Sequence, residues 1–79
     1  MAPEHVRAKA WRESRGLTRA ALGAMIGYSE SAIVNFEAGR HRQTGQPINP
    51  MQMLRYKMAC AAVASGLTFD WGEVTIRLD

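Results

Sequence analysis

Residues 16 to 40 contain two candidate helix N-cap residues and two candidate helix-terminating glycines, and few folds are compatible with this pattern. Thr18 and Ser29 carry hydroxyl groups that can accept a hydrogen bond from the free N–H groups of a first helical turn. Gly27 and Gly39 follow at a distance of one short helix and can adopt the left-handed conformation that ends a helix. The pattern predicts two short helices joined by a tight turn, over residues 19–26 and 30–38.

The apolar residues of these two segments recur at helical spacing. Leu22 and Ile26 lie four residues apart in the first segment. Ile33 and Phe36 lie three apart in the second, so each helix has an apolar face that the other can cover. The outward side of the second helix keeps mostly short side chains with donors and acceptors: Ser29, Glu30, Ser31, Val34 and Asn35. Two such helices form a helix-turn-helix, and this outward side is suited to reading base edges.

Length and composition limit the chain to one small domain, residues 1–79, in which residues 18–39 form the helix-turn-helix core. Hydrophobic residues make up 47%, which argues against disorder, and no run approaches the ~20 apolar residues that cross a bilayer. No signal or transit peptide is visible, so we expect a cytoplasmic protein with no membrane partner. The single cysteine, Cys60, cannot form an internal disulfide and is expected to be a small buried residue.

The positive charge is concentrated in the first half of the chain. Residues 1–42 carry seven Lys and Arg against four Asp and Glu, a net charge of +3. Residues 43–79 carry three of each, a net charge of zero. The surplus therefore surrounds the two-helix unit, as a polyanionic partner would require.

Two further helices are predicted, one on each side of this unit. The first runs from Pro3 to about Ser14 and is ended by Gly16; its inward residues are expected to be Val6, Ala8 and Trp11. The second is capped by Asn49, continues to about Ser65 and is ended by Gly66. Its apolar stripe is expected to fill the core and consists of Met51, Leu54, Met58 and Ala61 or Ala62. Residues 40–48 are predicted to form an ordered basic surface loop between the helices.

The end of the chain changes from a helical period to an alternating one. Apolar residues alternate with polar ones in two short sets: Leu67, Phe69 and Trp71, then Val74, Ile76 and Leu78. This alternation predicts a short β-hairpin with its apolar side facing either the helices or a second subunit.

Catalytic and metal-binding patterns are missing from the chain. His5 and His41 are isolated, without a Cys or carboxylate at metal-ligand spacing. No glycine-rich loop follows a strand, so there is no phosphate-binding motif of that kind. We therefore expect no enzyme, no metal and no cofactor.

The sequence resembles the Cro/repressor-type (XRE) helix-turn-helix family of phage and bacterial regulators over about residues 6–63. The residues that carry the resemblance are Arg12-Glu13-Ser14-Arg15-Gly16-Leu17-Thr18-Arg19-Ala20-Ala21-Leu22-Gly23, Gly27-Tyr28-Ser29, Ile33 and Phe36-Glu37-Ala38-Gly39-Arg40. The tail also resembles the short β-extension of many small members. The resemblance implies a mainly α fold, a four-helix lambda-repressor-like domain with a short C-terminal β-hairpin.

The resemblance also implies roles for individual residues. Arg12 and Glu37 match a pair that forms a structural salt bridge, the alternative being two solvated charges. Gly23 stands where the family usually has alanine. Contacts to DNA phosphates are implied for Thr18, Arg19, Arg40 and Arg42, with Arg19 replacing the usual glutamine.

Base reading is implied for four residues of the second helix: Ser29, Glu30, Ser31 and Asn35. Asn35 can make a two-pronged contact with adenine, and Glu30 can accept from cytosine N4. A favourable charge at a helix N-terminus explains Glu30 equally well.

Family members of this kind repress transcription from palindromic operators as homodimers. For this chain the dimerisation element is expected in residues 50–79, with the following contact residues: Met58, Phe69, Trp71, Val74, Ile76 and Leu78. The size fits a phage or mobile-element regulator, including repressors encoded beside anti-CRISPR genes. Two alternatives remain open, an antitoxin-type autoregulator and a protein-interaction module that has lost DNA binding. Double-stranded DNA is the expected partner, with RNA a lesser one because the aromatic residues are too dispersed to stack bases.

Overall fold

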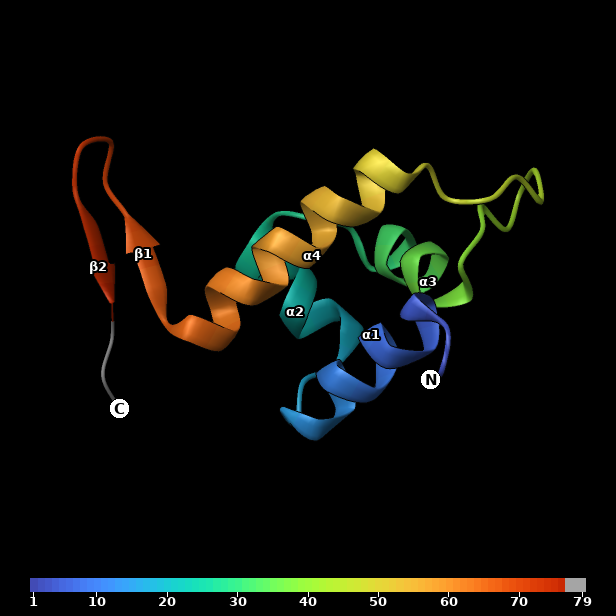
Figure 1. Cartoon of the computed structure of the whole chain (residues 1–79), viewed down its shortest axis with the longest axis horizontal. Helices are drawn as coiled ribbons and strands as arrows, with labels where there is room; N and C mark the ends of the chain where they lie inside the picture. Colours follow the sequence, from blue (N-terminus) through green and yellow to red (C-terminus); the bar gives the residue numbers. More distant parts are fainter. Residues whose placement is uncertain (77–79) are drawn as a thin grey trace.

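The computed structural model describes residues 1–76, without the side chain of Thr68. Four helices are followed by two strands (Figure 1): α1 (Glu4–Ser14), α2 (Arg19–Ile26), α3 (Glu30–Ala38), α4 (Pro50–Ser65), β1 (Leu67–Phe69) and β2 (Val74–Ile76). The mainly helical fold class predicted from the sequence is confirmed. No helix among residues 1–76 has the length and apolar character needed to cross a membrane.

The predicted caps begin the helices of the helix-turn-helix. The hydroxyl of Thr18 accepts a hydrogen bond from Ala21 N at 3.0 Å, and the hydroxyl of Ser29 accepts one from Ala32 N at 3.1 Å. Gly27 ends α2 in the left-handed conformation, at φ +80°. The local chemistry of these residues therefore sets the helix boundaries, because each cap satisfies a backbone group that the helix leaves unpaired.

One glycine is needed for close packing within this unit. A Cβ atom built on Gly23 of α2 would collide with the backbone carbonyl oxygen of Tyr28 and press on Ile33. The turn between α2 and α3 consequently lies closer to α2 than an alanine at this position would allow.

The core lies where α2, α3 and α4 meet. Its buried apolar residues are Leu22, Ile33, Phe36, Met53 and Tyr56. The rings of Phe36 and Tyr56 stack with centroids 4.3 Å apart, and Tyr28 meets both rings edge-on. Such aromatic pairs add stability beyond the area that they bury, which helps a domain of this size.

Two expectations about inward faces are wrong. Val6 of α1 is exposed, while Ala8 and Trp11 pack against the core as predicted. On α4 the buried residues are Met53 and Tyr56, with half-buried Cys60 beside them. The predicted stripe of Met51, Leu54 and Met58 is exposed instead. Because α4 carries apolar residues on more than one face, spacing alone could not identify the face that meets the other helices.

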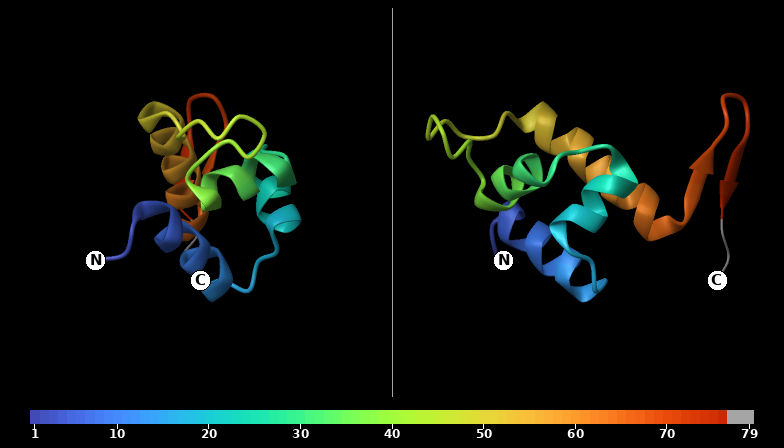
Figure 2. Two further views of the ribbon diagram at one scale, coloured as in Figure 1. Left: turned by 90° about the vertical axis from the view of Figure 1, so that its right-hand side faces the viewer. Right: turned by 180° about the vertical axis from the view of Figure 1, so that it is seen from behind.

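The predicted hairpin forms, but it projects from the helical body. Strands β1 and β2 pair antiparallel, with Leu67 opposite Ile76 and Phe69 opposite Val74. Figures 1 and 2 show the hairpin beyond the C-terminal end of α4, apart from helices α1, α2 and α3. All of the apolar side chains that the structure describes on the hairpin are exposed. Of the two predicted positions for its apolar side, the one against the chain's own helices is therefore wrong.

The loop between α3 and α4 is ordered by its own hydrogen bonds. His41 N donates to Gln46 O at 2.8 Å and Gly45 N donates to His41 O at 2.7 Å. A β-bridge links Arg40 to Pro47. This agrees with the ordered surface loop predicted for residues 40–48.

Candidate nucleic-acid interface

The N-terminal turn of α3 is the exposed edge of the helix-turn-helix. Ser29, Glu30 and Ser31 are all exposed, and Glu30 occupies the first turn of the helix. Val34 and Asn35, which were also expected to face outward, are half-buried. The first turn therefore offers hydroxyl and carboxylate groups to a partner, while the second turn begins to face the protein.

Glu37 fixes the rear face of α3 through two arginines. Its carboxylate accepts from Arg12 Nε at 2.6 Å and Nη2 at 3.1 Å, and from Arg19 Nε at 3.0 Å. Arg12 Nη1 also donates to the carbonyl of Leu17 at 2.8 Å. The side chain of Glu37 is only 2% exposed, so the contacts lie in a region of low dielectric where ion pairs are strong. The predicted salt bridge is present, and it holds α1, α2 and α3 at fixed relative positions.

The charges of this cluster are stabilised by their hydrogen bonds. Burial by itself would raise the pKa of Glu37, but the hydrogen bonds from Arg12 and Arg19 outweigh it and lower the pKa below its usual value. The same bond to Glu37 raises the pKa of Arg12 despite its burial. Glu37 and Arg12 are therefore both charged at neutral pH, and the cluster makes the arrangement rigid.

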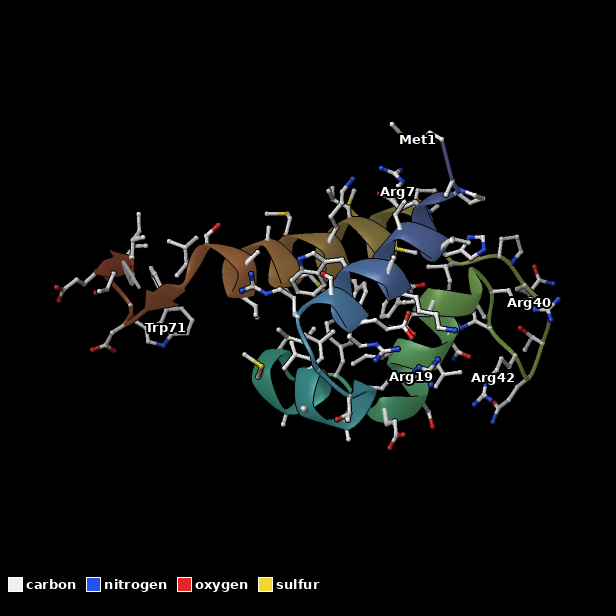
Figure 3. The ribbon with its side chains drawn as sticks, turned by 90° about the horizontal axis from the view of Figure 1, so that it is seen from below. Met1, Arg7, Arg19, Arg40, Arg42 and Trp71 are labelled. Atoms are coloured by element: carbon white, nitrogen blue, oxygen red, sulfur yellow. The ribbon has the colours of Figure 1, made fainter. Side chains whose placement is uncertain are left out.

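Arg19 has a position that the sequence did not predict. It was expected to contact phosphate alone, whereas its Nε atom pairs with Glu37 while a third of the side chain remains exposed. Arg40 and Arg42 are exposed at the other end of α3. Figure 3 shows Arg19 and Arg42 on the same side of the molecule as the exposed part of α3. The arginine side chains therefore border the helix, as contacts to a phosphate backbone would require.

Asn35 already has a partner within the chain. Its Oδ1 atom accepts a hydrogen bond from Arg42 N at 3.2 Å, which ties α3 to the following loop. The predicted two-pronged contact with adenine uses both the oxygen and the nitrogen of an asparagine side chain. Asn35 could make that contact only by sharing or releasing the bond to Arg42, so the structure makes it a weaker base-reading candidate than Ser31.

Thr18 lies at the start of α2 with its oxygen occupied by the cap. A hydroxyl that accepts a bond can also donate one, and a helix N-terminus is a favourable place for an anion. The cap and a phosphate contact are therefore compatible at this residue.

The residues predicted for dimer contact are exposed wherever the structure describes them. Met58 is 64% exposed on α4, and Phe69, Trp71, Val74 and Ile76 are exposed on the hairpin. Leu78 lies outside the described residues. Met51 and Leu54 join this exposed set although the sequence placed them in the core. The helical spacing of Met51, Leu54 and Met58 is evident in the sequence, but no pattern of neighbouring residues indicates that this side of α4 faces outward.

A helix-turn-helix domain family model matches residues 6–49, which is more than half of the chain. The chain belongs to the helix-turn-helix domain family, in agreement with the resemblance described above. The match covers most of α1 and all of α2 and α3, and it ends at the cap of α4, so it includes the exposed edge and the Arg12–Glu37 cluster. No curated protein and no solved structure matches the chain significantly. Membership of this family indicates a DNA-binding domain with a role in transcription regulation.

Proposed function

We propose that the protein is a cytoplasmic transcriptional repressor that binds a palindromic operator as a homodimer, with α3 in the major groove of each half-site. The observation that carries this proposal is the first turn of α3, which is exposed in front and fixed behind by Glu37. A helix held in this way enters a groove without losing much conformational freedom, so more of its contact energy is available for binding. Repression follows if the occupied site overlaps a promoter and excludes polymerase.

The contacts divide into two kinds. Thr18, Arg19, Arg40 and Arg42 hold phosphates and set the register of the helix on the duplex, without reading sequence. Ser29, Glu30 and Ser31 read base edges, and Asn35 contributes where its bond to Arg42 allows. Because Glu30 repels phosphates, a base donor such as cytosine N4 must face it at the preferred site.

The proposed repressor function also requires a dimer. One short helix contacts too few bases to select a site in a genome, whereas two related helices double the number. A two-fold dimer on palindromic DNA places the half-site centres one helical turn apart, ~34–36 Å. The exposed apolar residues of α4 and the hairpin provide the surface for such a dimer.

Selection of binding sites from a random duplex library tests the proposal directly. We expect a palindrome whose half-sites lie about one turn apart, and an affinity that falls steeply between ~50 and 200 mM salt as counterions are released. Recovery of no preferred sequence, together with binding insensitive to salt, would favour the alternative of a protein-interaction module. A single unpaired site would retain DNA binding and remove the dimeric arrangement.

Two substitutions test the reading residues once the site is known. Asn35→Ala should weaken binding to the selected site by ~1–3 kcal/mol and binding to random DNA very little. Glu30→Gln should change the preferred base if Glu30 reads sequence, because an amide donates where a carboxylate only accepts. An unchanged preference with slightly lower stability would assign Glu30 to the helix dipole instead.

A further inference from the structure

Trp71 is the most unusual residue of the hairpin. It lies in the turn between β1 and β2, is 92% exposed, and has φ +36°, the single described non-glycine residue with a positive φ. Its ring meets Phe69 edge-on with centroids 5.6 Å apart, but Phe69 is itself exposed. Both the exposure of an indole and the left-handed backbone cost free energy. Strained and exposed residues of this kind are typical of contact sites.

A cavity of suitable size lies between α1 and α4. It has a volume of about 250 Å³. Its walls are mainly apolar and come from Ala8, Trp11, Met53, Cys60, Ala61 and Ala64. An apolar cavity of roughly 150 Å³ accepts benzene in another protein, so this one has room for the larger indole ring. The cavity is therefore a match in size and chemistry for an aromatic side chain.

The charges around the two features are complementary. Asp70 and Glu73 flank the Trp71 turn, where Asp70 N donates to Glu73 O at 2.9 Å. The cavity is bordered by Arg7 and by the ion pair of Lys57 with Glu4, whose atoms lie 2.8 Å apart. The turn thus carries two negative charges, and the border of the cavity carries a net charge of +1. This arrangement favours an approach of the turn to the cavity.

The exposed stripe of α4 is a second apolar surface, separate from the lining of the cavity. Met51, Leu54 and Met58 follow one another at helical spacing, on a side of α4 that does not line the cavity. The cavity itself lies along α4 from Met53 to Ala64, beside α1.

We propose that in the homodimer Trp71 of each chain enters the α1–α4 cavity of a second copy, so that the hairpins are exchanged. The inference rests on the homodimer of the proposed function and specifies its contact. It leaves the reading face free, since Arg7 at the border of the cavity points to the opposite side of the molecule from Arg19 and Arg42 (Figure 3). The exchange covers the exposed aromatic residues and fills the cavity in one contact.

The exchanged arrangement also suits the spacing of DNA grooves. The molecule is 39 Å long, with the hairpin at one end and the α3–α4 loop at the other (Figure 1). Two hairpins paired only edge to edge would join the chains end to end and leave the α3 helices toward the outer ends. Chains that lie side by side bring the α3 helices closer, as half-sites one turn apart demand.

Sedimentation equilibrium of the full chain tests the exchange through Trp71→Ala. We expect the dimer dissociation constant to rise about 30-fold or more, because a tryptophan in a pocket is a typical interface hot spot. The matched control is Met25→Ala, which removes an exposed apolar side chain of α2 outside the α1–α4 cavity. Its dissociation constant should stay within about twofold of the unsubstituted chain.

The cavity is tested from its own side by Ala61→Phe, which fills the space meant for Trp71. The control is Ala24→Phe, the same change at an exposed alanine of α2 outside the cavity. Ala61→Phe should weaken the dimer about as much as Trp71→Ala, and Ala24→Phe should leave it unchanged. Circular dichroism of both variants checks that the helices are retained.

A charge exchange tests whether the contact is made between two chains. Arg7→Glu and Asp70→Lys should each weaken the dimer about two- to fivefold, and the double variant should recover most of the loss. In one chain these residues lie on separate elements, α1 and the hairpin turn, so recovery requires contact across the dimer.

The outcomes of these experiments distinguish failure of the homodimer from failure of the hairpin exchange. A chain that is monomeric at all concentrations overturns both the homodimer and the exchange. A dimer that Trp71→Ala and Ala61→Phe leave intact overturns the exchange alone. Loss of the dimer with both variants, but with neither control, supports it. Salt-dependent DNA binding is measured separately and does not depend on either result.

Discussion

The helical body and the β1–β2 hairpin place their apolar side chains in opposite surroundings. In the body Leu22 and Ile33 are fully buried, and the Glu37 cluster is closed within one chain. In the hairpin Val74 and Ile76 stay 58% exposed on a sheet of two strands. A two-stranded hairpin is at best marginally stable alone in water. The difference indicates that the body maintains the fold, whereas the hairpin depends on a surface that its own helices do not supply.

The largest effect is expected for Glu37→Ala in the body. Removing the carboxylate leaves Arg12 buried without its charge partner, which should lower the free energy of unfolding by ~3–5 kcal/mol. Urea denaturation followed by circular dichroism measures the loss. Glu30→Ala is the matched control on α3, exposed and expected to cost ~1 kcal/mol or less. Equal losses at the two positions would show that the cluster does not hold the body together.

A matched pair of isoleucines compares the two regions directly. Ile33→Ala should cost ~2–5 kcal/mol because it opens a cavity in a fully buried site. Ile76→Ala should change the unfolding free energy of the monomer by ~0.5 kcal/mol or less, because its side chain is exposed there. Thermal unfolding at dilutions where the chain is monomeric gives both values. A large loss at Ile76 in the monomer would mean that the hairpin supports its own chain after all.

The pH dependence of stability should reflect the body cluster. In the folded chain the pKa of Glu37 lies below its ordinary value of 4.5, since hydrogen bonds from Arg12 and Arg19 outweigh burial. Its contribution is therefore fully present above about pH 4.5 and is lost as the pH falls through the folded-state pKa. Denaturation midpoints between pH 6 and 3 should fall less steeply for Glu37→Gln than for the unsubstituted chain. Parallel curves for the two proteins would remove Glu37 as a source of acid sensitivity.

The smallest effect is expected for Tyr56→Phe. Desolvation raises the pKa of Tyr56 above its usual value, and among the described residues its hydroxyl has no well-aligned hydrogen-bond partner. Removing a buried, unsatisfied hydroxyl should leave the free energy of unfolding unchanged or raise it by up to ~1 kcal/mol. Chemical denaturation of the two proteins side by side measures the difference. A clear loss of stability would indicate that the hydroxyl is hydrogen-bonded in solution.

Features set by neighbouring residues could be predicted from the sequence, and the helix boundaries are the clearest case. Thr18, Ser29 and Asn49 cap helices where expected, because a cap involves a side chain and a backbone group only two or three residues away. The exposed first turn of α3 could also be predicted from neighbouring residues. The apolar residues of this segment recur at helical spacing, which leaves its polar residues on the opposite side of the helix.

Features set by distant residues were harder to predict. The inward face of α4 was assigned to Met51 and Leu54, whereas Met53 and Tyr56 are the ones buried, because the choice depends on where the other helices lie. The second arginine on Glu37 was missed because the resemblance implied only a phosphate contact for Arg19, and no local pattern links Arg19 to Glu37. The tie between Asn35 and Arg42 depends on the path of a loop with no periodicity.

Gly23 has a consequence for anyone who would engineer this protein. Alanine is the residue that the family resemblance implies at this place, and it would favour the helical backbone of α2 by ~1 kcal/mol. Here its methyl group would be driven into the carbonyl of Tyr28. The turn would have to move outward and change the direction of α3, so a substitution toward the commoner residue would gain helix propensity and lose the present placement of α3.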